Sequence, residues 1–147
     1  MSKSDFLENA ILKLIFNATA IANIADNAAS SPLTNLYWSL HTADPGDAGN
    51  QSTSETAYGL YARQPVARTT GGMTAASAGS TSPVANVVFP AANSPSLPTV
   101  SSITHAGIGI AVSGATALLY SGPVTPNINV SVGVQPILTT ASTVTED

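Results

Sequence analysis

The sequence has no cysteine and few charged residues, and both absences limit what the chain can be. Without cysteine there is no disulfide, thiolate metal ligand or cysteine nucleophile, so another contact, such as oligomerisation, must supply any cross-link. Charged residues make up 8 % of the 147 residues, where about 25 % is usual for a globular domain. Ser, Thr, Asn, Ala, Gly and Pro must cover the surface instead. Because these residues favour turns and strands over exposed helices, the composition argues against an all-helical protein.

Basic residues are also scarce, and the formal net charge is −4. The four that occur are Lys3, Lys13, Arg63 and Arg68. No patch built from so few cations neutralises several phosphates, so we expect no nucleic-acid binding.

An apolar stretch over residues 10–25 raises the question of a membrane or signal segment. Three polar residues interrupt it, namely Lys13, Asn17 and Asn23. The uninterrupted parts are much shorter than the roughly 20 apolar residues that a spanning helix needs. Asp5 and Glu8 precede the stretch, where a signal peptide would carry basic residues. We therefore expect the segment to belong to the mature fold and predict no membrane contact.

The length is typical of one domain, so we predict a single domain over residues 1–147, with an N-terminal helical segment (1–25) and a β-domain (34–147). Ser4 is suited to cap a helix, with Asp5 and Glu8 in its first turn. An apolar helical face follows, formed by Leu7, Ile11, Leu14, Ile15 and Ala18. This spacing predicts an amphipathic helix from about Asp5 to Ala20 or a little beyond.

The clearest strand is residues 36–41, where alternation places Leu36, Trp38 and Leu40 on one face. A polar stretch over residues 42–58 follows, and we expect a long surface loop with almost nothing to bury. Further strands are predicted at residues 62–68, 84–89, 100–110, 117–121, 128–134 and 137–144, with turns between them that include 75–83 and 122–126. Seven short strands at this spacing indicate an antiparallel β-sandwich or barrel, so the predicted fold is mainly β with one N-terminal helix.

Candidate catalytic residues are few, because His41 and His105 are the only imidazoles. No G-x-S-x-G turn is present, and we expect each histidine to hold a hydrogen bond at a strand. Asp44 and Asp47 show no metal-ligand spacing with these histidines, and an Asx-stabilised turn is the simpler interpretation of the Asp44 region. A pair of carboxylates for glycoside cleavage would have to come from Asp44, Asp47 or Glu55, and the sequence signal for such a pair is weak. We predict no enzyme activity, metal or cofactor.

Two further features concern packing. Gly107-Ile-Gly109 lacks the third glycine of a dinucleotide fingerprint and indicates a strand that another backbone or a bulky side chain approaches closely. Trp38 lies on the alternating apolar face and should be core. For Tyr58 and Tyr61, beside Arg63, a place in an interface and a place in the core remain equally open.

Several segments, taken in order, resemble those of a family of small virion proteins from the structural modules of tailed bacteriophages. They are Ser4 to Ala10, Leu36-Tyr-Trp-Ser-Leu-His-Thr-Ala-Asp-Pro-Gly46, Glu55 to Tyr58, Tyr61-Ala-Arg63, Val87-Val-Phe-Pro90, Ile103-Thr-His-Ala-Gly-Ile108, Leu118-Leu-Tyr-Ser-Gly122 and the Thr-Val-Thr-Glu-Asp ending. Members of this family are called tail or fibre proteins, and similar small proteins decorate capsids. The resemblance carries no catalytic motif.

The resemblance implies a virion structural protein. Our leading expectation is a capsid decoration or cement protein on the capsid exterior, a homotrimer that bridges subunits of the major capsid protein. The alternative is a tail or tail-fibre-associated structural protein, followed by a carbohydrate-binding module or a small hydrolase. The loop over residues 42–58 and the helix should supply contacts, since an isolated helix of this length needs its apolar face buried. The candidate interface residues are Leu7, Ile11, Leu14, Ile15, Tyr58, Tyr61 and Arg63.

Overall fold

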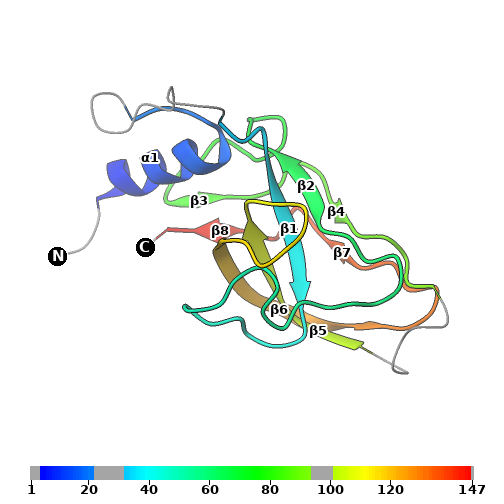
Figure 1. Ribbon diagram of the computed structural model, residues 1–147. Coiled ribbons are helices and arrows are strands. Elements are labelled where there is room, and N and C mark those ends of the chain that lie inside the picture. The colour runs from blue at the N-terminus through cyan, green and yellow to red at the C-terminus, as the bar shows by residue number, and fades with distance from the viewer. Residues whose placement is uncertain (1–3, 22–31, 94–100, 147) are drawn as a thin grey trace. The chain divides into compact units, whose positions relative to one another are not determined.

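The computed structural model describes residues 4–21, 32–93 and 101–146 of the chain (Figure 1). The chain forms two compact units. The first, which we call the terminal unit, comprises Met1–Leu36, Val66–Asn86 and Leu138–Asp147. The second, the central unit, comprises Tyr37–Pro65 and Val87–Ile137. The single domain expected from the chain length stays a prediction.

The helix α1 spans Asp5–Phe16 and begins as predicted. Ser4 is the N-cap, and its Oγ accepts a hydrogen bond from the Leu7 N–H at 3.4 Å. The helix ends before the predicted Ala20, because Ala18 takes a left-handed φ of 53°. The N–H of Thr19 then donates back to the Lys13 carbonyl at 3.0 Å and turns the chain away from the helix axis.

The side of α1 that is buried differs from the predicted one. Leu12 and Phe16 are 0 % and 1 % exposed, whereas Leu7 is 36 % exposed. The remaining large residues of the predicted face, Ile11, Leu14 and Ile15, are half-buried. The apolar residues of α1 are spread around its whole circumference, so periodicity alone could not select the buried face. Asn9 contributes a specific contact, since its Oδ1 accepts a hydrogen bond from the Gly79 N–H at 2.9 Å.

The strands of the terminal unit are very short. β3 (Ser80–Thr81) pairs antiparallel with β8 (Val144–Thr145), and α1 contacts β3. β3 lies inside the stretch that we predicted as a turn, residues 75–83. The strand predicted at residues 137–144 is interrupted, with β7 (Ile137–Leu138) at its start and β8 at its end. Two-residue strands carry too little alternation to be recognised from sequence.

The main sheet has four strands in the order β2-β1-β5-β6. Their bounds are Asn35–His41 for β1, Gln64–Ala67 for β2, Ser101–Gly109 for β5 and Leu118–Val130 for β6. β5 pairs antiparallel with both β1 and β6. A separate pair joins β4 (Val87–Val88) and β7. The four-stranded sheet is open, so the structure agrees with the predicted sandwich and not with the predicted barrel. The mainly β fold with antiparallel sheets, and with one short helix among the described residues, is thus confirmed.

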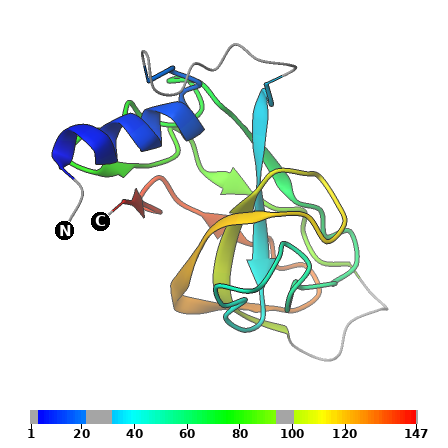
Figure 2. The same cartoon turned by 60° about the vertical axis from the view of Figure 1, so that its left-hand side comes forward.

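The strand β6 corrects a predicted turn. We expected residues 122–126 to separate two strands, but β6 continues through them, and Figure 2 shows it beside β5 along most of its length. Pro123 lies opposite His105, and the register then shifts before the Ile103 to Ile128 pair. Among the described strands, β6 pairs with β5 alone. Proline is tolerated in such edge strands because the missing N–H costs no ladder bond there.

The strand β1 is buried on both faces. Trp38 and Leu40 are 3 % and 0 % exposed, which confirms the predicted apolar face. Ser39 and His41, on the opposite face, are also 0 % exposed. The central unit must therefore satisfy the polar groups of these side chains internally.

Candidate functional site

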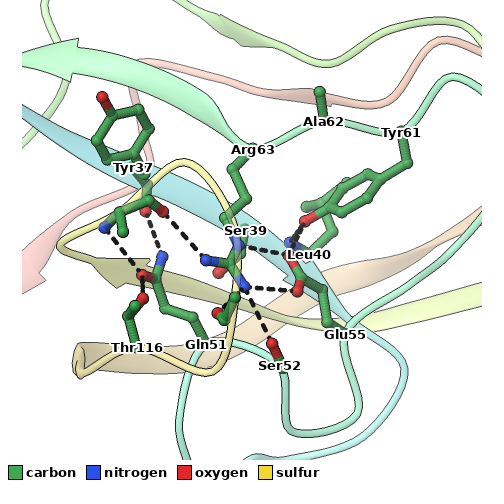
Figure 3. Close-up of polar contacts among 12 residues, drawn as sticks. Tyr37, Ser39, Leu40, Gln51, Ser52, Glu55, Tyr61, Ala62, Arg63 and Thr116 are labelled. Carbon is green, nitrogen blue, oxygen red and sulfur yellow. Dashed lines mark hydrogen bonds and ion pairs between the residues drawn. The ribbon is translucent and has the colours of Figure 1, made fainter.

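The central unit contains a buried ion pair between Arg63 and Glu55 (Figure 3). Arg63 is 4 % exposed. Its Nε donates to Glu55 Oε1 and its Nη2 donates to Glu55 Oε2, both at 2.7 Å. This two-pronged geometry matches the fork of the guanidinium to the carboxylate. The hydrogen bond to Glu55 raises the pKa of Arg63 above its ordinary value, so the guanidinium stays charged.

The remaining donors of Arg63 fasten a second segment of the chain. Nη1 donates to the Ala111 carbonyl at 3.0 Å, and Nη2 donates to the Gly114 carbonyl at 2.9 Å. Ala111 and Gly114 belong to the connection between β5 and β6. One buried cation therefore holds this connection to the segment that carries Glu55. We call residues 51–63 and 111–116, together with their contacts, the Arg63 frame.

Two tyrosines complete the frame. The hydroxyl of Tyr61 donates to Glu55 Oε1 at 2.9 Å and accepts from the Leu40 N–H at 3.0 Å. Tyr58 is 2 % exposed, and its hydroxyl donates to the Pro90 carbonyl at 3.0 Å. Burial raises the pKa of Tyr58 to about 12 and raises that of Tyr61 further, so both hydroxyls remain protonated donors.

Gln51 occupies the other end of the frame and is 0 % exposed. Its Nε2 donates to the Tyr37 carbonyl at 3.2 Å. Its Oε1 accepts from the Thr116 hydroxyl at 2.7 Å and from the Ala111 N–H at 3.2 Å. Figure 3 shows the side chains of Gln51 and Thr116 pointing toward each other. The loop over residues 42–58 thus buries specific side chains, which corrects the prediction that it has almost nothing to bury.

The two glycines of Gly107-Ile-Gly109 allow this packing. A Cβ at Gly109 would overlap the side chain of Gln51, and a Cβ at Gly107 would lie 2.7 Å from Nε2 of His41 and 2.9 Å from Oγ of Ser39. Both glycines therefore mark close approaches of bulky side chains. This confirms the interpretation of the segment as a closely approached strand and not a nucleotide-binding turn.

Ser39 and His41 have the contact that a hydrolase would need, since Ser39 Oγ lies 2.9 Å from His41 Nε2. The other ring nitrogen, Nδ1, lies 2.8 Å from the Thr53 carbonyl, where an orienting carboxylate would be expected in a triad. Both side chains are 0 % exposed, so this arrangement presents no nucleophile to a substrate. Burial lowers the pKa of His41 below its ordinary value, so the neutral ring is favoured. Its contacts describe a structural histidine.

The other polar candidates also form local structure. Asp44 Oδ1 accepts from the Gly46 N–H at 2.9 Å, which is the Asx-type contact that we predicted. Thr104 Oγ1 lies 2.9 Å from Nδ1 of His105, so this histidine has a hydrogen-bonding partner within its strand. No cluster of three potential metal ligands occurs within residues 4–21, 32–93 and 101–146. Within the same described ranges, no helix is long and apolar enough to cross a membrane.

The predicted interface residues fall into two groups. Tyr58, Tyr61 and Arg63 are joined in the Arg63 frame, where Tyr58 and Arg63 are buried and Tyr61 is half-buried. The helix residues belong to the terminal unit and remain partly exposed, with Leu7 the most exposed of them. These positions within one chain do not test contact with a partner, so the interface itself stays a prediction.

Several features of the structure gave no signal in the sequence. Phe6 is 72 % exposed beside the predicted helix face, and Leu60 is 64 % exposed with a left-handed φ of 68°. Gln51 gave no signal because a lone glutamine in a polar stretch is indistinguishable from a solvated one. The pairing of Glu55 with Arg63 spans only eight residues, but neither belongs to a periodic pattern that would place them together.

Comparison with known proteins adds the family. No curated protein matches the chain. A family model described as "Podophage GP4 fiber I protein gp80" matches residues 2–145, which is nearly the whole sequence. The chain therefore belongs to this family of bacteriophage structural proteins.

Proposed function

We propose that the chain is a non-catalytic structural subunit associated with the fibre of a tailed-phage particle. The match of residues 2–145 to a fibre family carries this proposal, because it covers both units of the chain. It favours the tail-fibre alternative over the capsid decoration protein that we expected first. A location in the virion follows from the same reasoning, whereas the capsid exterior has no support from the family description.

The Arg63 frame supports a structural role in a second way. A catalytic centre needs reactive groups within reach of a substrate. In the central unit the serine–histidine contact between Ser39 and His41 is buried and hydrogen-bonded, out of reach of a substrate. In the Arg63 frame, charged and polar side chains hold loops in fixed positions. This suits a protein whose surface must keep the same shape.

The terminal unit offers the contact surface that we propose for attachment to the particle. Phe6 and Leu7 are 72 % and 36 % exposed at the start of α1, and Ile11 and Leu14 follow on partly exposed turns. Burying this apolar strip against a neighbour would stabilise the complex by about 25 cal/mol for each Å² removed from water. The predicted contact with the major capsid protein and the predicted homotrimer both stay predictions.

The position of the protein in the particle can be measured directly. An antibody against the chain, coupled to gold and applied to intact particles, should label fibres and leave heads unlabelled. Quantitative mass spectrometry of purified particles should give a copy number close to that of other fibre components and far below that of the major capsid protein. Labelling spread over the head, at a copy number near that of the capsid protein, would restore the decoration interpretation.

The helix can be tested in the same particles. Replacing Ile11 and Leu14 with Asp should abolish incorporation, provided that circular dichroism still shows the strand signal of the wild type. The matched variant Val84→Asp alters an exposed residue of the same unit, 47 % exposed and outside the helix, and should be incorporated normally. Normal incorporation of the folded Ile11→Asp/Leu14→Asp variant would remove α1 from the interface.

A further inference from the structure

Leu60 occupies a backbone position that leucine rarely takes. Its φ is 68°, in the left-handed region where the Cβ is crowded by a neighbouring carbonyl oxygen. The residue lies in a tight turn, which the Tyr61 N–H closes by donating to the Tyr58 carbonyl at 2.9 Å. Glycine or asparagine is usual at a turn position with this backbone conformation. Leu60 therefore makes its own turn less stable than either of those residues would.

The side chain of Leu60 does not offset this strain within the chain. It is 64 % exposed, so folding removes little of its apolar surface from water. A bulky residue that neither suits its backbone nor fills the core is unexpected at this position. Because strained residues of this kind cluster at binding and active sites, the combination indicates a contact outside the chain.

The turn that carries Leu60 is fixed on both sides. The hydroxyl of Tyr58 donates to the Pro90 carbonyl at 3.0 Å. On the other side, Figure 3 shows the hydroxyl of Tyr61 pointing toward Glu55, whose carboxylate accepts its hydrogen bond. The two tyrosine rings also meet edge to face, with their centroids 5.3 Å apart. A side chain presented on such a rigid turn loses little conformational entropy when a partner binds.

The surroundings of Leu60 in the Arg63 frame are uncharged. Residues 57–62 and 111–116 contain no charged residue, and Val112, in the second of these segments, is 60 % exposed. The nearest charges in the sequence, Glu55 and Arg63, neutralise each other in the buried ion pair. A strongly charged partner would find no countercharge here, so the contact that this turn can make is apolar.

We infer that Leu60 inserts into an apolar pocket on a different protein of the phage particle. The inference rests on the proposed function, which makes the chain a subunit of a larger assembly. A side chain that projects from a turn needs a concave surface opposite it, and two copies that met turn to turn would bury much less area than a specific interface requires. A pocket elsewhere on a second copy would give a head-to-tail contact, which forms a ring or an open filament. A different protein avoids both difficulties.

The test is a competition for places in the particle. Phage is grown in cells that also produce a variant chain in an amount equal to the wild type, and mass spectrometry measures the ratio of the two chains in purified particles. Full burial of a leucine side chain changes a binding constant by roughly tenfold or more. Leu60→Asn should therefore be incorporated at about a tenth of the wild-type amount or less. Leu60→Met keeps an apolar side chain and should be incorporated as the wild type is.

Stability distinguishes a contact from a structural role. Asparagine tolerates the left-handed conformation, so the thermal midpoint of purified Leu60→Asn should equal or exceed that of the wild type. The matched control Val132→Asn makes the same kind of change at another residue of the central unit, 61 % exposed, and should be incorporated normally. A lowered midpoint in Leu60→Asn would show that the leucine stabilises its own chain, and it would overturn the inference.

Two further outcomes would also overturn it. One is normal incorporation of Leu60→Asn. The other is a wild-type oligomer in light scattering that Leu60→Asn dissociates, because the pocket would then belong to a second copy. The proposed function fails separately, since gold label on heads would refute the fibre location and leave the requirement for Leu60 unchanged. Normal incorporation of Leu60→Asn into particles with labelled fibres would refute the Leu60 contact alone.

Discussion

The buried ion pair of the Arg63 frame makes a quantitative prediction about stability. Replacing Glu55 with Gln keeps the size of the side chain but leaves the Arg63 guanidinium, 4 % exposed, without its countercharge. Breaking a buried pair in this way costs about 3–5 kcal/mol. The Glu55 side chain is 15 % exposed, so water screens it slightly and we expect the lower end, about 3 kcal/mol. The midpoint of thermal unfolding should then fall by roughly 6 to 12 °C.

The assay is urea unfolding followed by the fluorescence of Trp38, which is 3 % exposed in the folded chain. The midpoint should fall while the slope against urea stays constant, since the same surface is exposed on unfolding. Asp44→Asn is the matched control, because it makes the same chemical change at an exposed carboxylate. It should alter the free energy of unfolding by no more than about 0.5 kcal/mol.

A double variant separates the pair from its surroundings. Glu55→Leu/Arg63→Met removes both charges, and it should be more stable than Glu55→Gln because no buried charge is left unpaired. It should remain less stable than the wild type, since the carbonyls of Ala111 and Gly114 lose their donor. A Glu55→Gln variant as stable as Asp44→Asn would refute the reasoning, since the ion pair would then contribute nothing measurable.

Three further predictions concern single residues. Burial lowers the pKa of His41 below 6.5, so the unfolded chain takes up the proton first as the pH falls. The free energy of unfolding should therefore decrease below that pH, and the decrease should be less steep in His41→Asn than in the matched variant His105→Asn. Gly109→Ala should destabilise the chain by about 1–3 kcal/mol in thermal unfolding because its Cβ overlaps a buried side chain, while Gly122→Ala, which has open space around it, should change little. Arg68 donates to the carbonyls of the last turn of α1, and Arg68→Gln should speed amide exchange in the helix without changing exchange in β5.

Local patterns were sufficient for some elements. The Ser4 cap depends on one side chain and the next turn of the helix, so the sequence shows it directly. The strand β1 was equally predictable, because the alternation from Leu36 to Leu40 marks the apolar one of its two buried faces. Such features depend on residues that are neighbours in the sequence, and this is the range over which pattern reasoning works.

Features set by distant contacts were not readable. Proline and glycine at residues 122–126 indicated a turn by local preference, but edge pairing with β5 accommodates them within β6. The helix face was misassigned because apolar residues surround α1, and a hydrogen bond from Gly79 to Asn9, 70 residues away in sequence, lies on the buried side. Local preference and tertiary contact disagreed at both places, and the tertiary contact prevailed.

In the candidate site too, some residues could be identified from the sequence and others only from the fold. Tyr58, Tyr61 and Arg63 stood out in the sequence as a cluster whose place, core or interface, was open, and the structure joins them in one frame. Gln51 escaped notice, although its side chain forms three hydrogen bonds there. The buried partners of a polar side chain can be identified only once the fold has brought them together.

The hydrogen bonds of Arg63 join parts of the chain that are 48 and 51 residues apart. In a protein with cysteine, a disulfide between such segments would restrict the unfolded chain in advance. A guanidinium cannot, because its bonds exist only while both segments are in place, and so neither loop can be released without disturbing the other. The amides of residues 51–56 and 111–116 should therefore exchange with solvent through one shared opening event, with equal free energies, as a single cooperative unit.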